Sequence, residues 1–286
     1  MPQNPRKPPR RGQSEGRGSR ADGRSIGGSG GRDRKDGGSD GRSSGGSGGR
    51  DRKGGGRRDP GPAEQRPRKP WSPAGGQLPK WVGDQLGRVT PKGKLPAATE
   101  HLLAAATFFA SGKYGKAFAE AEQAKELSPR DATIREILAL CAYRLGRWDI
   151  ALRELRTFRR FTGENTHMPV EMDVLRALNR GKDIEAVWEA FNQIRGGVRA
   201  TRDEAKVVYG SYLLDAGDAH RAWEVTNPKR MPADPEESEL RVWYVASKAA
   251  HSLGDLETAR QLLTAIERCD SAFPGLDELG RQLRND

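Results

Sequence analysis

Apolar residues recur every three or four positions on both sides of short polar breaks in the central part of the chain. The spacing is clearest in residues 99–110 and 133–145, which precede a break, and in residues 115–127 and 149–161, which follow one. A spacing of three to four places apolar side chains on one face of an α-helix. The pattern therefore predicts pairs of helices, each pair joined by a tight turn.

A glycine marks each break and recurs at intervals of 34, 35, 36 and 37 residues, with an alanine five residues after it. The glycines are Gly112, Gly146, Gly181, Gly217 and Gly254, and the alanines are Ala117, Ala151, Ala186, Ala222 and Ala259. Glycine allows the backbone conformation of a tight turn, and the small alanine lets the second helix approach the first. An internal repeat of this length predicts about five helix-turn-helix units that stack on one another.

The first two units carry further features of a known repeat. An aromatic residue follows the glycine by two positions, at Tyr114 and Trp148, and Pro129 closes the first unit. With these residues the chain resembles the tetratricopeptide repeat (TPR) family over about residues 97–270. The whole chain, with its Arg- and Gly-rich start, is similar to small actinobacterial TPR proteins. The resemblance implies an all-α, right-handed superhelical solenoid whose concave groove binds a protein or peptide.

Two flanking segments are predicted to cover the ends of the repeats. Residues 78–90 can form a short lead-in helix, and residues 273–283 can form a C-terminal capping helix. The apolar positions of the lead-in helix are Leu78, Trp81, Val82, Leu86 and Val89, and those of the capping helix are Leu276, Leu279 and Leu283. The expected organisation is a tail over 1–77, a lead-in helix and linker over 78–96 and a repeat domain over 97–286.

The basic character of the chain is confined to its start. Residues 1–80 contain 20 Lys or Arg and 8 Asp or Glu, a net charge of +12, whereas residues 81–286 contain 30 and 31, a net charge of −1. Residues 1–80 also hold 21 of the 36 glycines and few apolar side chains. Such a composition cannot bury enough apolar surface to offset the entropy of ordering the chain. A disordered basic tail is therefore predicted.

No catalytic, cofactor-binding or metal-binding motif is present in the sequence. The two cysteines and the four histidines lie far apart, without metal-ligand spacing. We therefore expect neither an enzyme nor a cofactor, and no small-molecule substrate. The N-terminus has no apolar core typical of a secretory signal, and no run approaches 18 apolar residues, so we expect no membrane span and a cytoplasmic location.

By the same resemblance, the first helix of each unit lines the groove. The residues expected there are Leu102, Phe109, Glu136, Leu140, Tyr143, Arg144, Tyr244, Lys248 and His251. For Leu102, Phe109 and Leu140 the alternative is packing between neighbouring units, because apolar stripes at helical spacing also form cores.

Two features allow a second class of function, an RNA- or nucleoid-associated protein. The basic tail can neutralise nucleic-acid phosphates without reading the base sequence, although a solubilising or tethering linker is the alternative. A second basic feature, the arginine stripe, consists of Arg153, Arg156, Arg159 and Arg160. The stripe either binds phosphates or acidic groups, or is a solvated outer helix face.

Overall fold

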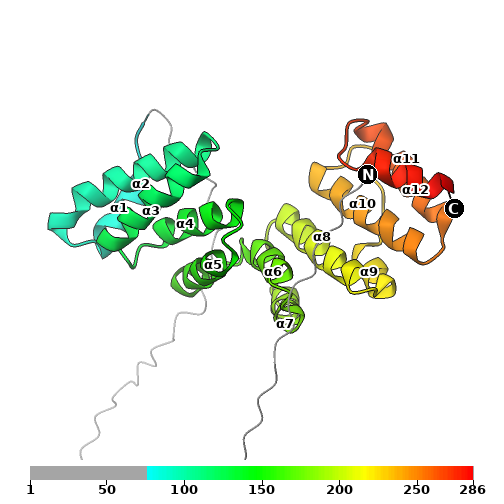
Figure 1. Ribbon diagram of the computed structural model, residues 1–286, viewed down its shortest axis with the longest axis horizontal. Coiled ribbons are helices and arrows are strands. Elements are labelled where there is room, and N and C mark those ends of the chain that lie inside the picture. The colour runs from blue at the N-terminus through cyan, green and yellow to red at the C-terminus, as the bar shows by residue number, and fades with distance from the viewer. Residues whose placement is uncertain (1–75, 286) are drawn as a thin grey trace, which may run out of the picture. The chain divides into compact units, whose positions relative to one another are not determined.

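The computed structural model describes residues 76–285, and the regular elements in this range are twelve α-helices and one short 3-10 helix (Figure 1). Their bounds are α1 Lys80–Val89, η1 Lys92–Lys94, α2 Leu95–Ala110, α3 Tyr114–Leu127, α4 Ala132–Arg144, α5 Trp148–Thr162, α6 Met168–Ala177, α7 Gly181–Asn192, α8 Arg199–Asp215, α9 Ala219–Thr226, α10 Glu237–Ser252, α11 Leu256–Cys269 and α12 Leu276–Asn285. No β-strand occurs between residues 76 and 285, so the all-α prediction is confirmed for this range. The predicted tail lies outside the described residues, except for its last two positions.

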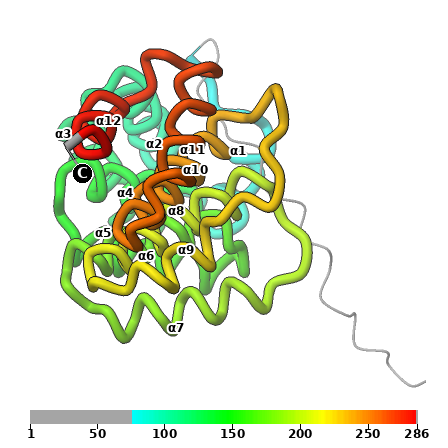
Figure 2. The backbone as a smooth tube through the Cα atoms, turned by 90° about the vertical axis from the view of Figure 1, so that its right-hand side faces the viewer, coloured from blue at the N-terminus to red at the C-terminus, as the bar shows by residue number. Residues whose placement is uncertain are grey.

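The helices pack as five consecutive hairpins, α2–α3, α4–α5, α6–α7, α8–α9 and α10–α11. Each hairpin contacts the next, through α3 and α4, α5 and α6, α7 and α8, and α9 and α10. Figure 2 follows this alternation of helix and turn along the backbone. The predicted helix-turn-helix pairs are therefore present over residues 95–269.

All five hairpin turns have the same backbone geometry. One residue in each turn has a left-handed φ, namely 71° at Gly112, 67° at Gly146, 55° at Asn179, 80° at Gly217 and 80° at Gly254. Its N–H donates to the carbonyl three residues earlier at 2.9–3.1 Å, and the next N–H donates to the carbonyl five residues before itself at 2.8–3.0 Å. This is the Schellman motif, which satisfies the last carbonyls of the first helix and reverses the chain. The second helix begins two residues after the left-handed residue in every case.

The prediction for the third turn was wrong by two residues. Asn179 takes the left-handed position, and Gly181 is instead the first residue of α7. Among the amino acids, asparagine is second only to glycine in adopting this conformation, because its short polar side chain can form a local hydrogen bond. The position five residues further on is therefore Ile184, which is 1% exposed, and Ala186 lies on the exposed face of α7.

Gly181 has a packing role in place of a turn role. A Cβ atom at this position would lie 2.7 Å from the Tyr212 hydroxyl of α8. The missing side chain thus allows Tyr212 to approach the start of α7.

The left-handed turns predict a specific order of substitution costs. Gly254→Ala should lower the free energy of unfolding by about 1–2 kcal/mol, because an alanine resists this φ, although no heavy atom lies within 4 Å of the added Cβ. Gly254→Asn should cost less, since Asn179 occupies the equivalent place in hairpin three. Urea denaturation of the two variants tests the order, and equal losses would show that φ does not determine the cost.

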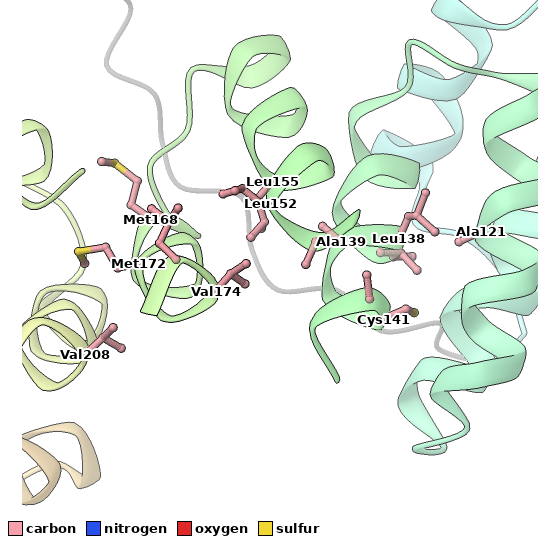
Figure 3. Close-up of a cluster of buried hydrophobic side chains, with 14 of the residues drawn as sticks. Ala121, Leu138, Ala139, Cys141, Leu152, Leu155, Met168, Met172, Val174 and Val208 are labelled. Carbon is pink, nitrogen blue, oxygen red and sulfur yellow. The ribbon is translucent and has the colours of Figure 1, made fainter. Parts of the chain in front are cut away.

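The buried side chains form one main cluster from α1 to α10 and two smaller ones in the last helices. Figure 3 shows part of the main cluster, whose labelled side chains come from α3, α4, α5, α6 and α8. Trp223 of α9 packs against all three clusters and so connects the last hairpin to the rest of the core. Apolar contact across every hairpin junction is the main stabilising term, because each hairpin alone leaves one face uncovered.

Both flanking helices are present. Val82 and Leu86 of α1 are fully buried, but Trp81 is 38% and Val89 39% exposed, so the apolar face of the lead-in helix is narrower than predicted. At the other end, α12 buries Leu279 and Leu283 against α11 and the last core cluster, as expected.

Candidate functional site

Glu154 of α5 is a fully buried carboxylate at the junction of hairpins one and two. It accepts from Lys125 Nζ of α3 at 3.3 Å, from Arg135 Nη1 of α4 at 2.5 Å and from Arg153 Nε at 3.1 Å. Arg135 also donates through Nε and Nη2 to the carbonyl of Pro129. A buried charge is tolerated only when it is paired and hydrogen-bonded, and Glu154 meets both conditions.

Glu171 of α6 plays the same part at the junction of hairpins two and three. It is 1% exposed, and its carboxylate lies 2.9 Å from Arg156 Nε and 3.2 Å from Arg159 Nη2. Arg153 pairs with Glu154, as described above. The fourth member of the arginine stripe, Arg160, lies over the ring of Phe161 at 5.5 Å. Three of the four stripe arginines therefore bind carboxylates of this chain.

A third polar cluster, built around the buried Tyr209, joins hairpins three and four. The Tyr209 hydroxyl of α8 donates to Glu185 of α7 at 2.5 Å, and Arg221 of α9 also donates to Glu185, at 2.9 Å. Trp188 stacks on the Tyr209 ring with centroids 4.3 Å apart. Burial, followed by the bond to Glu185, raises the pKa of Tyr209 well above its ordinary value, so the hydroxyl stays protonated. Tyr209 is 1% exposed, so its contacts join the two hairpins and are not open to a partner.

A different row of side chains runs along the first helices of the hairpins, and we call it the first-helix face. The positions are found by counting back from the left-handed turn residue along the first helix of hairpins two to five. Residues at a few equivalent positions share one face of these helices. They are Glu136, Leu140, Tyr143 and Arg144 of α4, Asp173 and Arg176 of α6, Glu204 and Asp215 of α8, and Arg241, Tyr244 and Lys248 of α10.

Side-chain contacts connect this row from one hairpin to the next. Tyr143 Oη donates to Asp173 Oδ2 at 2.6 Å, which joins α4 to α6. Arg176 Nε donates to Asp215 Oδ2 at 2.6 Å, which joins α6 to α8. A third pair, Arg241 with Glu204 at 3.3 Å, joins α10 to α8. The five charged side chains of these three contacts are 30–58% exposed, so they remain within reach of a partner.

Tyr143 is held in a defined position on this face. Besides its bond to Asp173, its ring contacts Trp148 edge to face at 5.8 Å. Burial, followed by the hydrogen bond to Asp173, raises the pKa of Tyr143 to about 12. The hydroxyl is therefore protonated at neutral pH and donates to a carboxylate that also faces solvent.

The other predicted groove residues of hairpins one and two have distinct environments. Leu102 is fully buried and belongs to the core. Phe109 is half-buried and contacts Tyr114 edge to face at 5.4 Å, and the Arg144 guanidinium lies 5.8 Å from the centre of the same Tyr114 ring. Leu140 is half-buried, and Glu136 bonds His167 at 2.7 Å.

In hairpin five the predicted groove residues have different surroundings, and Tyr244 packs against the C-terminal segment. The Tyr244 ring packs on Phe273, 5.6 Å between centroids, and its hydroxyl reaches Gly275 at the start of the capping segment. Lys248 is exposed and His251 is half-buried. The structure thus brings together the residues predicted on α4 with those on α6 and α8 that were not predicted.

The unpredicted members are Asp173, Arg176, Glu204, Asp215 and Arg241. The sequence offered one signal for Asp173 and Arg176 of α6. Asn179 can end a helix in the left-handed conformation, which places the turn of hairpin three two residues before Gly181. For α8 and α10 the glycines were already correct, and the equivalent positions required only counting back from Gly217 and Gly254.

Within residues 76–285 no group of three or more His, Cys, Asp or Glu side chains is arranged to hold a metal ion. No helix in that range has the length and apolar character needed to cross a membrane. Comparison with protein-family models and with curated proteins found no match to this chain.

Proposed function

We propose that this protein is a non-enzymatic interaction module, built as a TPR-like solenoid, that binds a segment of a partner protein along the first-helix face. The observation that carries the proposal is the row from Tyr143 to Arg241, in which half-exposed polar side chains of successive hairpins are linked and held in place. A surface whose side chains are already ordered loses less entropy on binding. Extended faces of this kind suit a peptide or helix with aromatic and charged contacts.

Affinity purification with the full-length chain tests the proposal. Tyr143→Ala should weaken capture of the partner about tenfold or more, because aromatic side chains at the centre of an interface contribute most to binding. Phe161→Ala is the matched control, since Phe161 is an exposed aromatic on the second helix α5 and lies off the face. A partner that is lost equally from both variants, or from neither, would refute the assignment of the face.

The second candidate, nucleic-acid binding through the tail, is favoured by the +12 charge of residues 1–80. The arginine stripe supports it less, because Arg153, Arg156 and Arg159 already pair with Glu154 and Glu171. A nuclease-treated arm of the same purification separates the two functions. Capture that disappears with nuclease and falls steeply with salt belongs to the tail.

A further inference from the structure

Four basic side chains gather at the turns of hairpins one and two. Lys113 lies in the first turn, Lys116 follows in α3, Arg144 ends α4 and Arg147 lies in the second turn. All four are exposed, and none pairs with a carboxylate of residues 76–285. We call this set the cationic edge; it adjoins the first-helix face at Arg144.

Three of the four cations are held over aromatic rings. The pairs are Lys116 over Phe108 at 5.7 Å, Arg144 over Tyr114 at 5.8 Å and Arg147 over Phe118 at 4.3 Å. Both arginines come from hairpin two and both of their rings from hairpin one, so the packing of the two hairpins fixes the spacing of the guanidinium groups. A guanidinium placed over a ring keeps its N–H donors at its rim, where they can bind a carboxylate in bidentate fashion.

Two of the four cations, Lys113 and Arg147, stand where a carboxylate would stabilise the fold. Lys113 and Arg147 immediately precede α3 and α5, with ψ of 60° and 68°, and neither makes a capping hydrogen bond. Asp218 and Asp255 have nearly the same backbone, with ψ of 68° and 73°, and each accepts from the backbone N–H three residues later. A positive charge at the start of a helix is unfavourable. Arg180, the equivalent residue of hairpin three, also lacks a capping bond, but it pairs with Asp183. Lys113 and Arg147, by contrast, pair with no carboxylate of residues 76–285. Positions that break a local rule without such compensation are typical of functional surfaces.

From the charge and its placement we propose that the cationic edge binds an acidic segment of the partner protein. This inference rests on the proposed function and names the chemistry of the partner. Single-stranded nucleic acid is the less favoured ligand, because it binds by stacking bases on free aromatic faces. Here the rings of Phe108, Tyr114 and Phe118 already carry a cation.

Hydrogen–deuterium exchange on the full-length chain tests the inference, with a polyglutamate peptide as the probe. A local readout is needed because the basic tail also attracts polyanions. We expect the peptide to slow exchange of backbone amides in residues 111–118 and 144–150. An uncharged peptide should not, and an oligouridylate of matched charge should protect them less. Protection by oligouridylate alone, or by no probe, would overturn the inference.

Charge reversal gives a second test, in which stability should rise while binding of the acidic probe falls. Lys113→Asp should raise the melting temperature, because it supplies the missing cap, and should weaken polyglutamate binding at this edge about tenfold. Lys182→Glu is the matched control: Lys182 is an exposed cation in the first turn of α7, so its reversal also favours the helix but lies away from the edge. Loss of binding in both variants, or in neither, contradicts a specific site. If Tyr143→Ala releases the partner while Lys113→Asp does not, this inference fails and the proposed function stands.

Discussion

Replacing Glu154 by alanine is expected to lower the free energy of unfolding by about 3–5 kcal/mol, the cost of leaving a buried ion pair without one partner. The carboxylate is fully buried, and Arg135, which is 15% exposed, cannot turn to solvent without releasing the Pro129 carbonyl. Urea denaturation of the full-length chain measures the loss. Glu154→Gln should lose less, because the amide oxygen still accepts a hydrogen bond while the charge is gone.

The pH dependence of the stability of wild type and of Glu154→Gln gives an independent check. Burial on its own would raise the pKa of Glu154, but the hydrogen bond and charge of Arg135, with Lys125 and Arg153, outweigh it and lower the pKa below its ordinary value of 4.5. A lowered pKa in the folded state contributes stability that is complete above pH 4.5 and is lost as the pH falls through the folded pKa. The stability difference between wild type and Glu154→Gln should therefore shrink below pH 4.5. A difference that is constant with pH would mean that the charge of Glu154 does not stabilise the junction.

The hairpins could be predicted because the information is local. A three-to-four spacing of apolar residues and a glycine at each reversal are properties of neighbouring residues, and Gly112, Gly146, Gly217 and Gly254 all occupy the turns they were assigned. The third turn failed because two residue types share the left-handed conformation. Gly181 was the nearest glycine to the expected interval, whereas the chain uses Asn179.

The contacts between hairpins were not predictable in the same way. The arginines of the stripe were visible as a cluster, but Glu171, the carboxylate partner of Arg156 and Arg159, lies on the next helix, beyond the loop that follows α5. Whether Arg156 is a free surface charge or a clamp on a buried carboxylate depends on how α5 and α6 pack. Tyr143 and Arg144 were identified from their position in the repeat, yet the partner that fixes Tyr143, Asp173, became visible only with the correct start of hairpin three.

Gly210→Ala is expected to destabilise the protein by about 1–3 kcal/mol, although alanine is the better helix former by about 1 kcal/mol. Gly210 lies buried in the middle of α8, and an added Cβ would be 2.6 Å from Thr226 Cγ2 and 3.1 Å from Val245 Cγ1. Thr226 cannot rotate away without losing the hydrogen bond from its hydroxyl to the Ala222 carbonyl at 2.7 Å. Overpacking should therefore exceed the gain in helix propensity.

Two further variants make this prediction sharp. Thr226→Ser removes Cγ2 and keeps the hydroxyl, so in a double-mutant cycle it should recover part of the stability lost in Gly210→Ala. Gly83→Ala in α1 is the control, because no heavy atom lies within 4 Å of its added Cβ and only the propensity gain remains. That variant should be more stable than wild type by about 0.5–1 kcal/mol. Thermal and urea denaturation that show the same sign for Gly83→Ala and Gly210→Ala would mean that the close approach of α8 to α9 and α10 does not depend on a missing side chain.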